Sequence, residues 1–218
     1  MASTYDALDD RLIAFIKAQK LFFVATAPLS AEGSVNVSPK GYDSLVVLDA
    51  HTVAYLDLGG SGIETLAHVR ENGRITLMFC AFEGQASILR LYGRGEATNF
   101  DDPGFAELMA LFPTFERARS IITVHIDRIA DSCGWGVPFM DFRGEREQLR
   151  RHVDHRPEAE WRARRYESNS TSIDGLPGLV RAKTSPSPII PAKAGTQAES
   201  NAVQTPPGPP PSRGRSES

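Results

Sequence analysis

The chain has 218 residues, of which 41% are hydrophobic and 23% charged, which is enough apolar material for a globular core. Its formal net charge of -3 argues against a nucleic-acid-binding protein, since such proteins usually carry a basic excess. The two cysteines, Cys80 and Cys133, exclude a disulfide framework, and we expect no metal site.

The composition divides the chain into a domain and a tail. All aromatic residues fall at or before Tyr166, and residues 180–218 are rich in proline. Such a segment buries too little surface to offset its ordering entropy, so we predict a single domain over 1–179 and a disordered tail over 180–218. The acidic start and the lack of a long apolar run favour a cytoplasmic protein that does not contact membranes.

Apolar residues recur at helical spacing over 6–19, which predicts a first helix. The period then changes, and strands are expected at 21–27 and 35–38 and in a hairpin formed by 45–48 and 52–56. A glycine-rich stretch follows at 57–65, where Ser61 and Glu64 have the spacing of a capping box. We therefore predict a helix that begins at Gly62 and ends near Gly73.

Strands are expected again at 74–82, 88–98 and 120–129, with a bulge or close backbone approach at Gly93 and Gly95. A helix with acidic residues in its first turn is predicted over 101–113, and a charged helical stretch interrupted at Pro157 over 144–166. Short antiparallel strands with few long crossovers indicate a mainly β (α+β) protein. We expect a β-barrel of about six strands with peripheral helices.

Three segments are candidates for binding chemistry. Residues 57–65 are either an anion site at a helix N-terminus or a tight strand-to-helix turn. Lys40, just past a strand, is either placed near a phosphate or flavin or is an ordinary solvated lysine. Trp135, between two glycines, is either a stacking group or a hydrophobic plug.

These segments together resemble the pyridoxamine 5'-phosphate oxidase-like family of FMN-binding split barrels. The best match is residues 53–79 (VAYLDLGGSGIETLAHVRENGRITLMF), followed by 35–40 (VNVSPK), 90–97 (RLYGRGEA), 132–138 (SCGWGVP) and 172–179 (SIDGLPGL). The resemblance covers 1–179 and implies a six-stranded antiparallel split β-barrel. It also implies a homodimer with two FMN sites at its interface.

The resemblance also implies roles for individual residues. Residues 61–65 (including Ser61 and Thr65) would hold the FMN phosphate, with Lys40 supplying charge. The ribityl chain and ring would be lined by Asn36, Ser38, Tyr55 and Leu56. Arg90 is expected to reach the flavin or its phosphate, and Trp135 to cover the ring from the same or the partner subunit.

Two departures from the family pattern limit what the resemblance implies. Glu64 and Thr65 stand where true pyridoxamine phosphate oxidases carry an Arg-Lys pair. Residues 173–179 also lack the arginine-containing substrate-binding segment that ends those enzymes. Oxidation of vitamin B6 is therefore not expected of this chain.

The function expected from the sequence is that of an FMN-dependent oxidoreductase acting on an unidentified small molecule. Because the flavin carries the hydride or electron chemistry, no catalytic side chain is nominated. NADH or NADPH is a candidate electron donor. The alternatives are a non-catalytic split-barrel protein that binds or senses flavin or haem, and a deazaflavin-dependent reductase.

Overall fold

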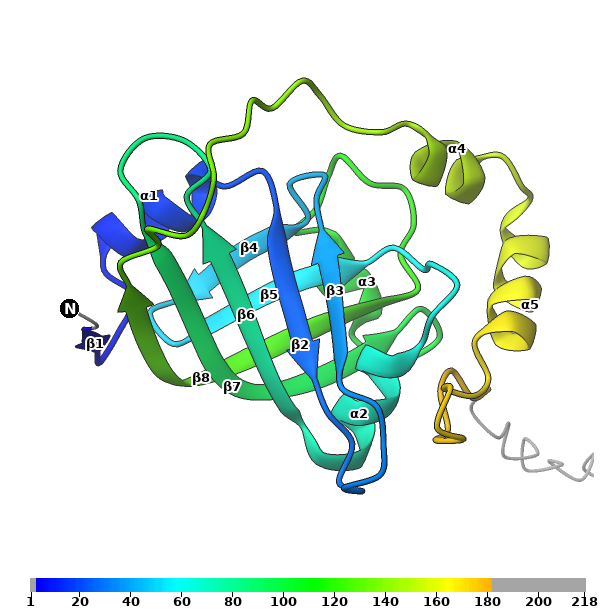
Figure 1. The fold of residues 1–218 in the computed structure, drawn as a ribbon. Coiled ribbons are helices and arrows are strands. Elements are labelled where there is room, and N and C mark those ends of the chain that lie inside the picture. Colours follow the sequence, from blue (N-terminus) through cyan, green and yellow to red (C-terminus); the bar gives the residue numbers. More distant parts are fainter. Residues whose placement is uncertain (1–2, 182–218) are drawn as a thin grey trace, which may run out of the picture. The chain divides into compact units, whose positions relative to one another are not determined.

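Eight strands form one antiparallel sheet in the computed structural model, which describes residues 3–181 apart from the side chains of 152–154. The strands are β1 (Thr4–Tyr5), β2 (Phe22–Thr26), β3 (Asn36–Lys40), β4 (Leu45–Asp49), β5 (Thr52–Asp57), β6 (Arg74–Cys80), β7 (Ile88–Asn99) and β8 (Ser120–Ser132). The helices are α1 (Asp10–Ala18), α2 (Glu64–Asn72), α3 (Phe105–Met109), α4 (Gln148–Asp154) and α5 (Glu158–Ser168) (Figure 1). Of the expected tail, 180–218, all but Val180 and Arg181 lies outside the described residues.

The strands are hydrogen-bonded in the order β3-β2-β6-β7-β8-β5-β4, and β1 pairs with β8. The expectation of a mainly β, antiparallel protein is confirmed. The expected number of about six strands is wrong, because the sheet has eight: β2 to β8 match the seven segments with strand patterns, and β1 is a two-residue strand too short to leave one. Among the described residues no pairing joins the edge strands β3 and β4, so closure of a barrel is not found.

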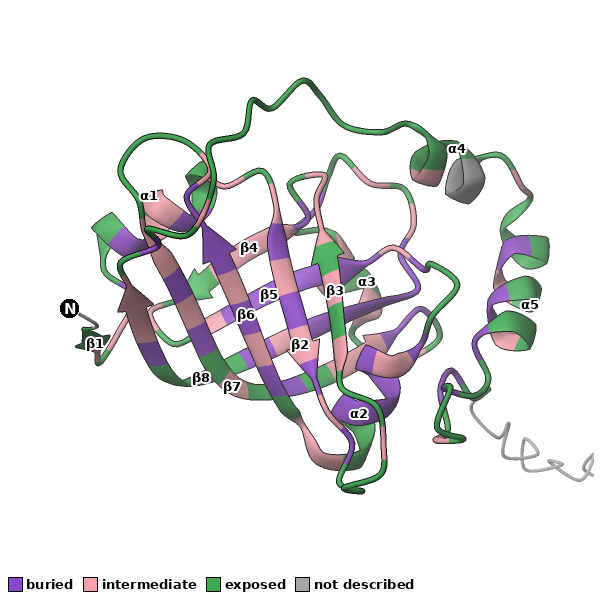
Figure 2. Cartoon of the chain, in the orientation of Figure 1, coloured by how far each residue is buried: buried purple, intermediate pink, exposed green. Residues whose placement is uncertain are grey.

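The core lies on the inner face of this sheet. Alternate residues of neighbouring strands are buried there, among them Val24, Leu77 and Leu91, while the residues between them are more exposed (Figure 2). This alternation follows from the two-residue period of a strand. Leu12 and Ile16 of α1 add to the same apolar cluster, so α1 packs against the sheet as its helical spacing predicts.

Gly93 and Gly73 have the backbone roles that the sequence predicts. The register of β7 against β8 shifts between Tyr92 and Gly93, and a Cβ on Gly93 would lie 2.1 Å from the His125 carbonyl oxygen. The predicted bulge or close approach there is therefore confirmed. Gly73 ends α2 in the left-handed conformation, with φ of 71°, also as predicted.

The start of α2 differs from the prediction. The helix begins at Glu64 rather than Gly62, its N-cap residue is Ile63, and no side chain caps it. Ser61 and Glu64 thus do not form the expected capping box. The physical reason is burial: Ile63 is 2% exposed and packs with Leu66 and Trp161, which fixes the entry to the helix by apolar contact.

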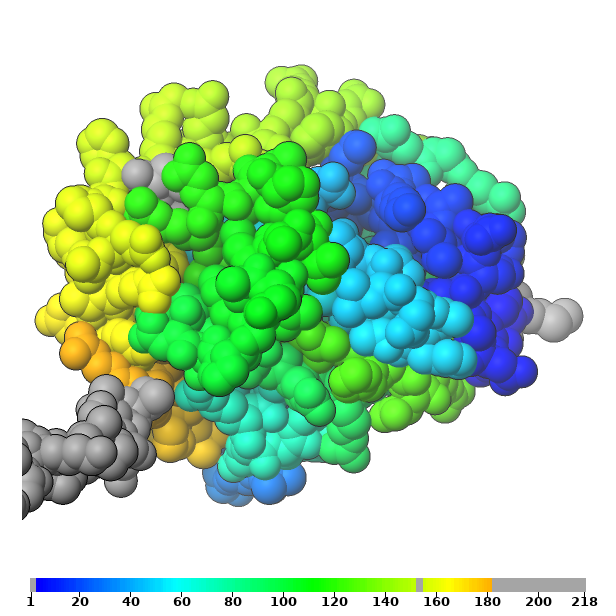
Figure 3. Space-filling view, turned by 180° about the vertical axis from the view of Figure 1, so that it is seen from behind, coloured from blue at the N-terminus to red at the C-terminus, as the bar shows by residue number. Residues whose placement is uncertain are grey.

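The C-terminal helices build a second apolar cluster beside α2. Trp161 of α5 packs against Ile63, Leu66 and Phe100, with ring centroids of Trp161 and Phe100 5.5 Å apart. Figure 3 shows α5 beside the α3 region on this face of residues 3–181. Pro157 separates α4 from α5 as predicted, whereas α3 is shorter than expected, at five residues. Over the described part of the chain, no helix has the length and apolar character needed to span a membrane.

Candidate functional site

The end of β5 brings three charged side chains together. Asp57 is buried and accepts hydrogen bonds from Arg119 Nε at 3.2 Å and Nη2 at 2.6 Å. Arg119 is positioned there because Ser120, the next residue, pairs with Asp57 across β5 and β8. Lys40, the last residue of β3, places its Nζ 3.8 Å from Asp57 Oδ1. The ion pair between Lys40 and Asp57 therefore connects the edge strand β3 to β5, which are not neighbours in the sheet.

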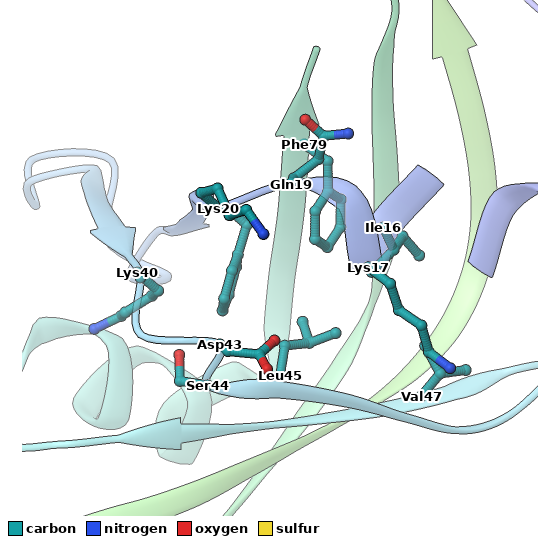
Figure 4. A pocket seen from close by; sticks show the side chains of 12 residues that line it. Ile16, Lys17, Gln19, Lys20, Lys40, Asp43, Ser44, Leu45, Val47 and Phe79 are labelled. Atoms are coloured by element: carbon teal, nitrogen blue, oxygen red, sulfur yellow. The ribbon is translucent and has the colours of Figure 1, made fainter. Parts of the chain in front are cut away.

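Lys40 borders a small cavity, but its ammonium group is directed to Asp57. That cavity has a volume of about 40 Å³ and lies between α1, β2 and the segment from Lys40 to Leu45. Figure 4 shows the Lys40 ammonium directed away from Lys20 and Phe79, which line the cavity. A space of this size holds only a few water molecules and is too small for a cofactor.

The charge of Asp57 is stabilised by its cationic neighbours. Burial raises the pKa of this carboxyl, but the charges of Arg119 and then Lys40, with hydrogen bonds from Arg119 and the Gly59 backbone, outweigh it and lower the pKa to about 2. Asp57 is therefore ionised at neutral pH.

The glycine-rich loop that follows is held by its carbonyl groups. Arg165 Nη1, from α5, donates to Gly59 O at 2.7 Å and Gly60 O at 3.1 Å. Three further bonds hold the rest of the loop: Asn169 Nδ2 to Gly60 O at 3.4 Å, Asn169 Nδ2 to Ser61 O at 3.3 Å and Arg119 Nη1 to Gly62 O at 2.8 Å.

The orientation of these carbonyl groups determines where the amide groups point. In a planar trans peptide the N–H of the following residue is directed opposite to the C=O. The N–H groups of residues 60–63 therefore point away from Arg165, Asn169 and Arg119. Successive N–H groups presented at a helix N-terminus are suited to bind an anion.

The charges around the loop also favour an anion. Lys40, Arg119 and Arg165 gather here, and Asp57 is the carboxylate that pairs with the first two. Arg165 is 7% exposed, and its Nε has no hydrogen-bond partner among the described residues. Burial, and then the neighbouring charge of Arg119, lower the pKa of Arg165. An uncompensated buried cation is costly, so an anion nearby would stabilise this cluster.

Glu64 brings a negative charge to the same loop. Its Oε1 accepts a hydrogen bond from the Ile173 N–H at 3.4 Å, and its Oε2 lies so close to Gly62 that a Cβ there would be 2.4 Å away. The carboxylate is thus folded back between the loop and the C-terminal segment. It opposes the binding of an anion at this end of α2.

A polar cluster underlies the first turn of α2. Asn36 Nδ2 donates to Thr65 Oγ1 at 2.9 Å and to Thr26 Oγ1 at 3.3 Å, and Thr26 Oγ1 is 3.0 Å from His68 Nδ1. Burial lowers the pKa of His68, which favours the neutral imidazole. The structure therefore brings together Asn36 and Thr65, while the exposed Ser61 lies in the glycine-rich loop and Lys40 lies beside it.

The remaining candidate residues lie elsewhere. The side chains of Tyr55 and Leu56 are buried in two apolar clusters on opposite faces of β5. Ser38, within β3, has a buried Oγ with no partner among the described residues. Arg90 donates to Ser132 Oγ at 3.0 Å, near the β6–β7 turn, which Figure 1 shows at the opposite end of the sheet from α2.

Trp135 follows β8 at that same distant end. Its side chain is 86% exposed, so the described chain does not bury it as a plug. Within one chain the structure does not bring Trp135 or Arg90 to the loop before α2. Outside the undescribed side chains, no three His, Cys, Asp or Glu residues gather as metal ligands would.

Sequence reasoning missed Arg119, Arg165 and Asn169. A signal for two of them was present, because Trp161, Arg165 and Asn169 are four residues apart and so lie on one face of a helix. An arginine on the same face as a buried tryptophan is a candidate for a buried functional group. Arg119 had no comparable signal, since it precedes a strand in a segment of ordinary composition.

The fold and the loop define a mainly β protein whose candidate site is a glycine-rich, cation-flanked loop before a helix. The chain belongs to the pyridoxamine 5'-phosphate oxidase family, whose model matches residues 8–133. It is 39% identical over 193 residues to the pyridoxamine 5'-phosphate oxidase family protein ustO of Aspergillus flavus, covering 80% of this chain and 77% of that protein.

Two solved structures are also similar. HupZ of Group A Streptococcus is 24% identical, with a TM-score of 0.46, covering 56% of this chain and 91% of that one. An FMN-binding protein of Syntrophomonas wolfei is 13% identical, with a TM-score of 0.41, covering 55% of this chain and 80% of that one. The family assignment rests on the family model and the Aspergillus relative.

Proposed function

We propose that this protein is an FMN-dependent oxidoreductase that acts on a small molecule. One observation carries the proposal: side chains bond the carbonyl groups of residues 59–62, which turns the N–H groups of 60–63 away from them, beside a cluster in which Lys40, Arg119 and Arg165 outnumber the carboxylates of Asp57 and Glu64. This combination suits a phosphate group at the N-terminus of α2. Membership of the pyridoxamine 5'-phosphate oxidase family supports a flavin as the bearer of that phosphate.

The residues present fit such a cofactor. The loop would bind the phosphate through its amide groups and Ser61, and Lys40, with a side chain 21% exposed, would add a mobile cation. Asn36 and Ser38 of β3 would contact the ribityl chain, and the buried Ser38 Oγ without a partner supports this role. Tyr55 and Leu56 would support the site from within the sheet, because their side chains are buried and β5 pairs with both β4 and β8.

Bound FMN supplies the hydride or electron transfer, and the protein binds and orients it. Glu64 distinguishes this site from that of a true pyridoxamine phosphate oxidase, because it puts a carboxylate where a cation would strengthen phosphate binding. The substrate is therefore proposed to differ from vitamin B6.

We further propose a two-fold symmetric homodimer of split barrels, in which the unpaired edges β3 and β4 border the split. Arg90 and Trp135 lie far from the loop of their own chain, so they would serve the flavin of the partner subunit. A strongly exposed tryptophan is typical of a surface that another molecule covers. Light scattering should give the mass of a dimer; a monomer with flavin still bound would contradict this part of the proposal.

Mass spectrometry of the small molecule released on denaturing the purified protein tests the proposal. We expect FMN, together with a flavin absorbance spectrum that bleaches when NADH or NADPH is added. Release of haem or a deazaflavin would show that the cofactor is that molecule and not FMN. Flavin that neither nicotinamide cofactor nor a screened substrate reduces would favour a binding or sensing protein. A protein that releases no flavin and takes up none would refute the proposal.

A further inference from the structure

We propose that the C-terminal helix α5 is part of the cofactor site, and that Arg165 makes the loop selective for a phosphorylated flavin. The inference rests on the proposed function, because it names the residue that decides which form of the flavin is held. Arg165 is a positioning residue: it acts on the cofactor through the loop and through its charge. Two independent observations support it, one of geometry and one of charge.

The geometry concerns the first two peptide groups of the loop. Arg165 Nη1 bonds the carbonyl oxygens of Gly59 and Gly60. The N–H groups of Gly60 and Ser61 are thereby turned to the opposite side. Without this guanidinium, the Gly59 carbonyl would lose its bond to α5 while Asn169 would still bond Gly60 O, so the peptide after Gly59 would rotate more freely, because glycine has few conformational restrictions.

Close packing shows that α5 and the loop fit one another. Gly59 has a φ of 84°, and a Cβ there would come within 3.2 Å of Arg119 Cβ and 3.3 Å of Arg165 Cδ. The loop thus lies directly against both arginine side chains. Trp161, one turn earlier on α5, is buried against Ile63 and Leu66 and so fixes the helix beside α2.

The charge of Arg165 has no carboxylate of its own. Its hydrogen bonds go to carbonyl groups, its Nε lacks a partner among the described residues, and it lies near Arg119. Residues 64 and 65 add no positive charge, since they are glutamate and threonine. A phosphate on the amide side of the loop lies across the peptide groups from Arg165, so it would be attracted by this charge through the loop and not by direct contact.

This arrangement couples the binding of a phosphate to the docking of α5 on the loop. If a phosphate binds better when α5 is docked, α5 must dock better when the phosphate is bound, by the same factor. FMN should thus protect α5 from opening, whereas riboflavin, which lacks the phosphate, should protect it much less. The C-terminal helix would then act as a structural requirement for selecting FMN.

The test compares FMN and riboflavin in three variants of the full chain, by quenching of flavin fluorescence. Arg165→Gln keeps a donor but removes the charge, and we expect it to weaken FMN about tenfold, a typical coupling between two sites, and riboflavin much less. Arg165→Lys keeps the charge and should retain most of the preference for FMN. Arg164→Ala, an exposed neighbour on α5, is the control and should change neither affinity.

A second measurement uses only the wild-type chain, so it does not depend on whether the variants fold. Trypsin cleavage within α5 of the wild-type chain should be slower with FMN than with riboflavin at equal saturation. Equal loss of both ligands in Arg165→Gln, or equal protection by both in the trypsin assay, would overturn the role of Arg165 in selection. Wild-type protein that binds neither flavin would instead refute the proposed function itself.

Discussion

Replacing Asp57 by asparagine should destabilise the fold strongly. The change removes the charge that meets Arg119 Nη2 at 2.6 Å and Nε at 3.2 Å in a buried setting. Breaking a buried ion pair by removing one partner costs about 3–5 kcal/mol, because the other charge is left uncompensated. The partly exposed Lys40, 3.8 Å from Asp57, should add at most about 1 kcal/mol to this loss.

Urea denaturation of the wild type and of Asp57→Asn measures this loss as a difference in the free energy of unfolding. Asp127→Asn, at an exposed position on β8, is the matched control and should stay within about 0.5 kcal/mol of the wild type. Because Asp57→Asn leaves the cations without their carboxylate, added inorganic phosphate should raise its melting temperature more than that of the wild type. A loss no larger than the control's, or no extra effect of phosphate, would refute the reasoning.

The remaining predictions concern the same loop. Lys40→Ala should weaken the binding of FMN about ten- to hundredfold and that of riboflavin much less, as titration of the cofactor-free protein would measure. An equal loss of affinity for both ligands would indicate that Lys40 contacts the flavin ring and not the phosphate. Because the pKa of Asp57 falls from its ordinary value of 3.8 to about 2 in the folded protein, its stabilisation of about 2 kcal/mol is present above pH about 4 and is lost as pH falls towards 2. Urea denaturation of wild type and Asp57→Asn across that range should show their difference shrinking, and a constant difference would contradict the assignment. Glu64→Gln removes a negative charge beside Gly62 and should strengthen FMN severalfold while leaving riboflavin unchanged; weaker FMN binding would show that Glu64 instead supports the loop.

Local patterns predicted the elements of this fold well. Alternating residues marked the strands, the Asn72–Gly73 step ended α2, and Gly93 marked the bulge, because each signal depends on the backbone at that position. The false capping box shows the limit of such signals. Ser61 and Glu64 have suitable spacing, but Ile63 packs against the distant Trp161, and that contact sets the start of the helix.

The site itself could be predicted only in part. Lys40 and the glycine-rich loop were recognisable, since a glycine run before a helix is a local feature. The groups that shape the loop were not, because Arg119 and Arg165 lie 57 and 106 residues away along the chain from the carbonyl groups they bond. Which arginine reaches a loop depends on how α5 and β8 pack, and no local period encodes that packing.

The central claim is that the loop before α2 holds the phosphate of FMN. Parallel titration of the purified, cofactor-free full chain with FMN and with riboflavin tests it most directly, because the two ligands differ only in that phosphate. FMN should bind at least about tenfold more tightly than riboflavin, which corresponds to one charge-assisted contact, and a higher salt concentration should reduce this difference in affinity. Equal affinity for the two ligands would contradict it.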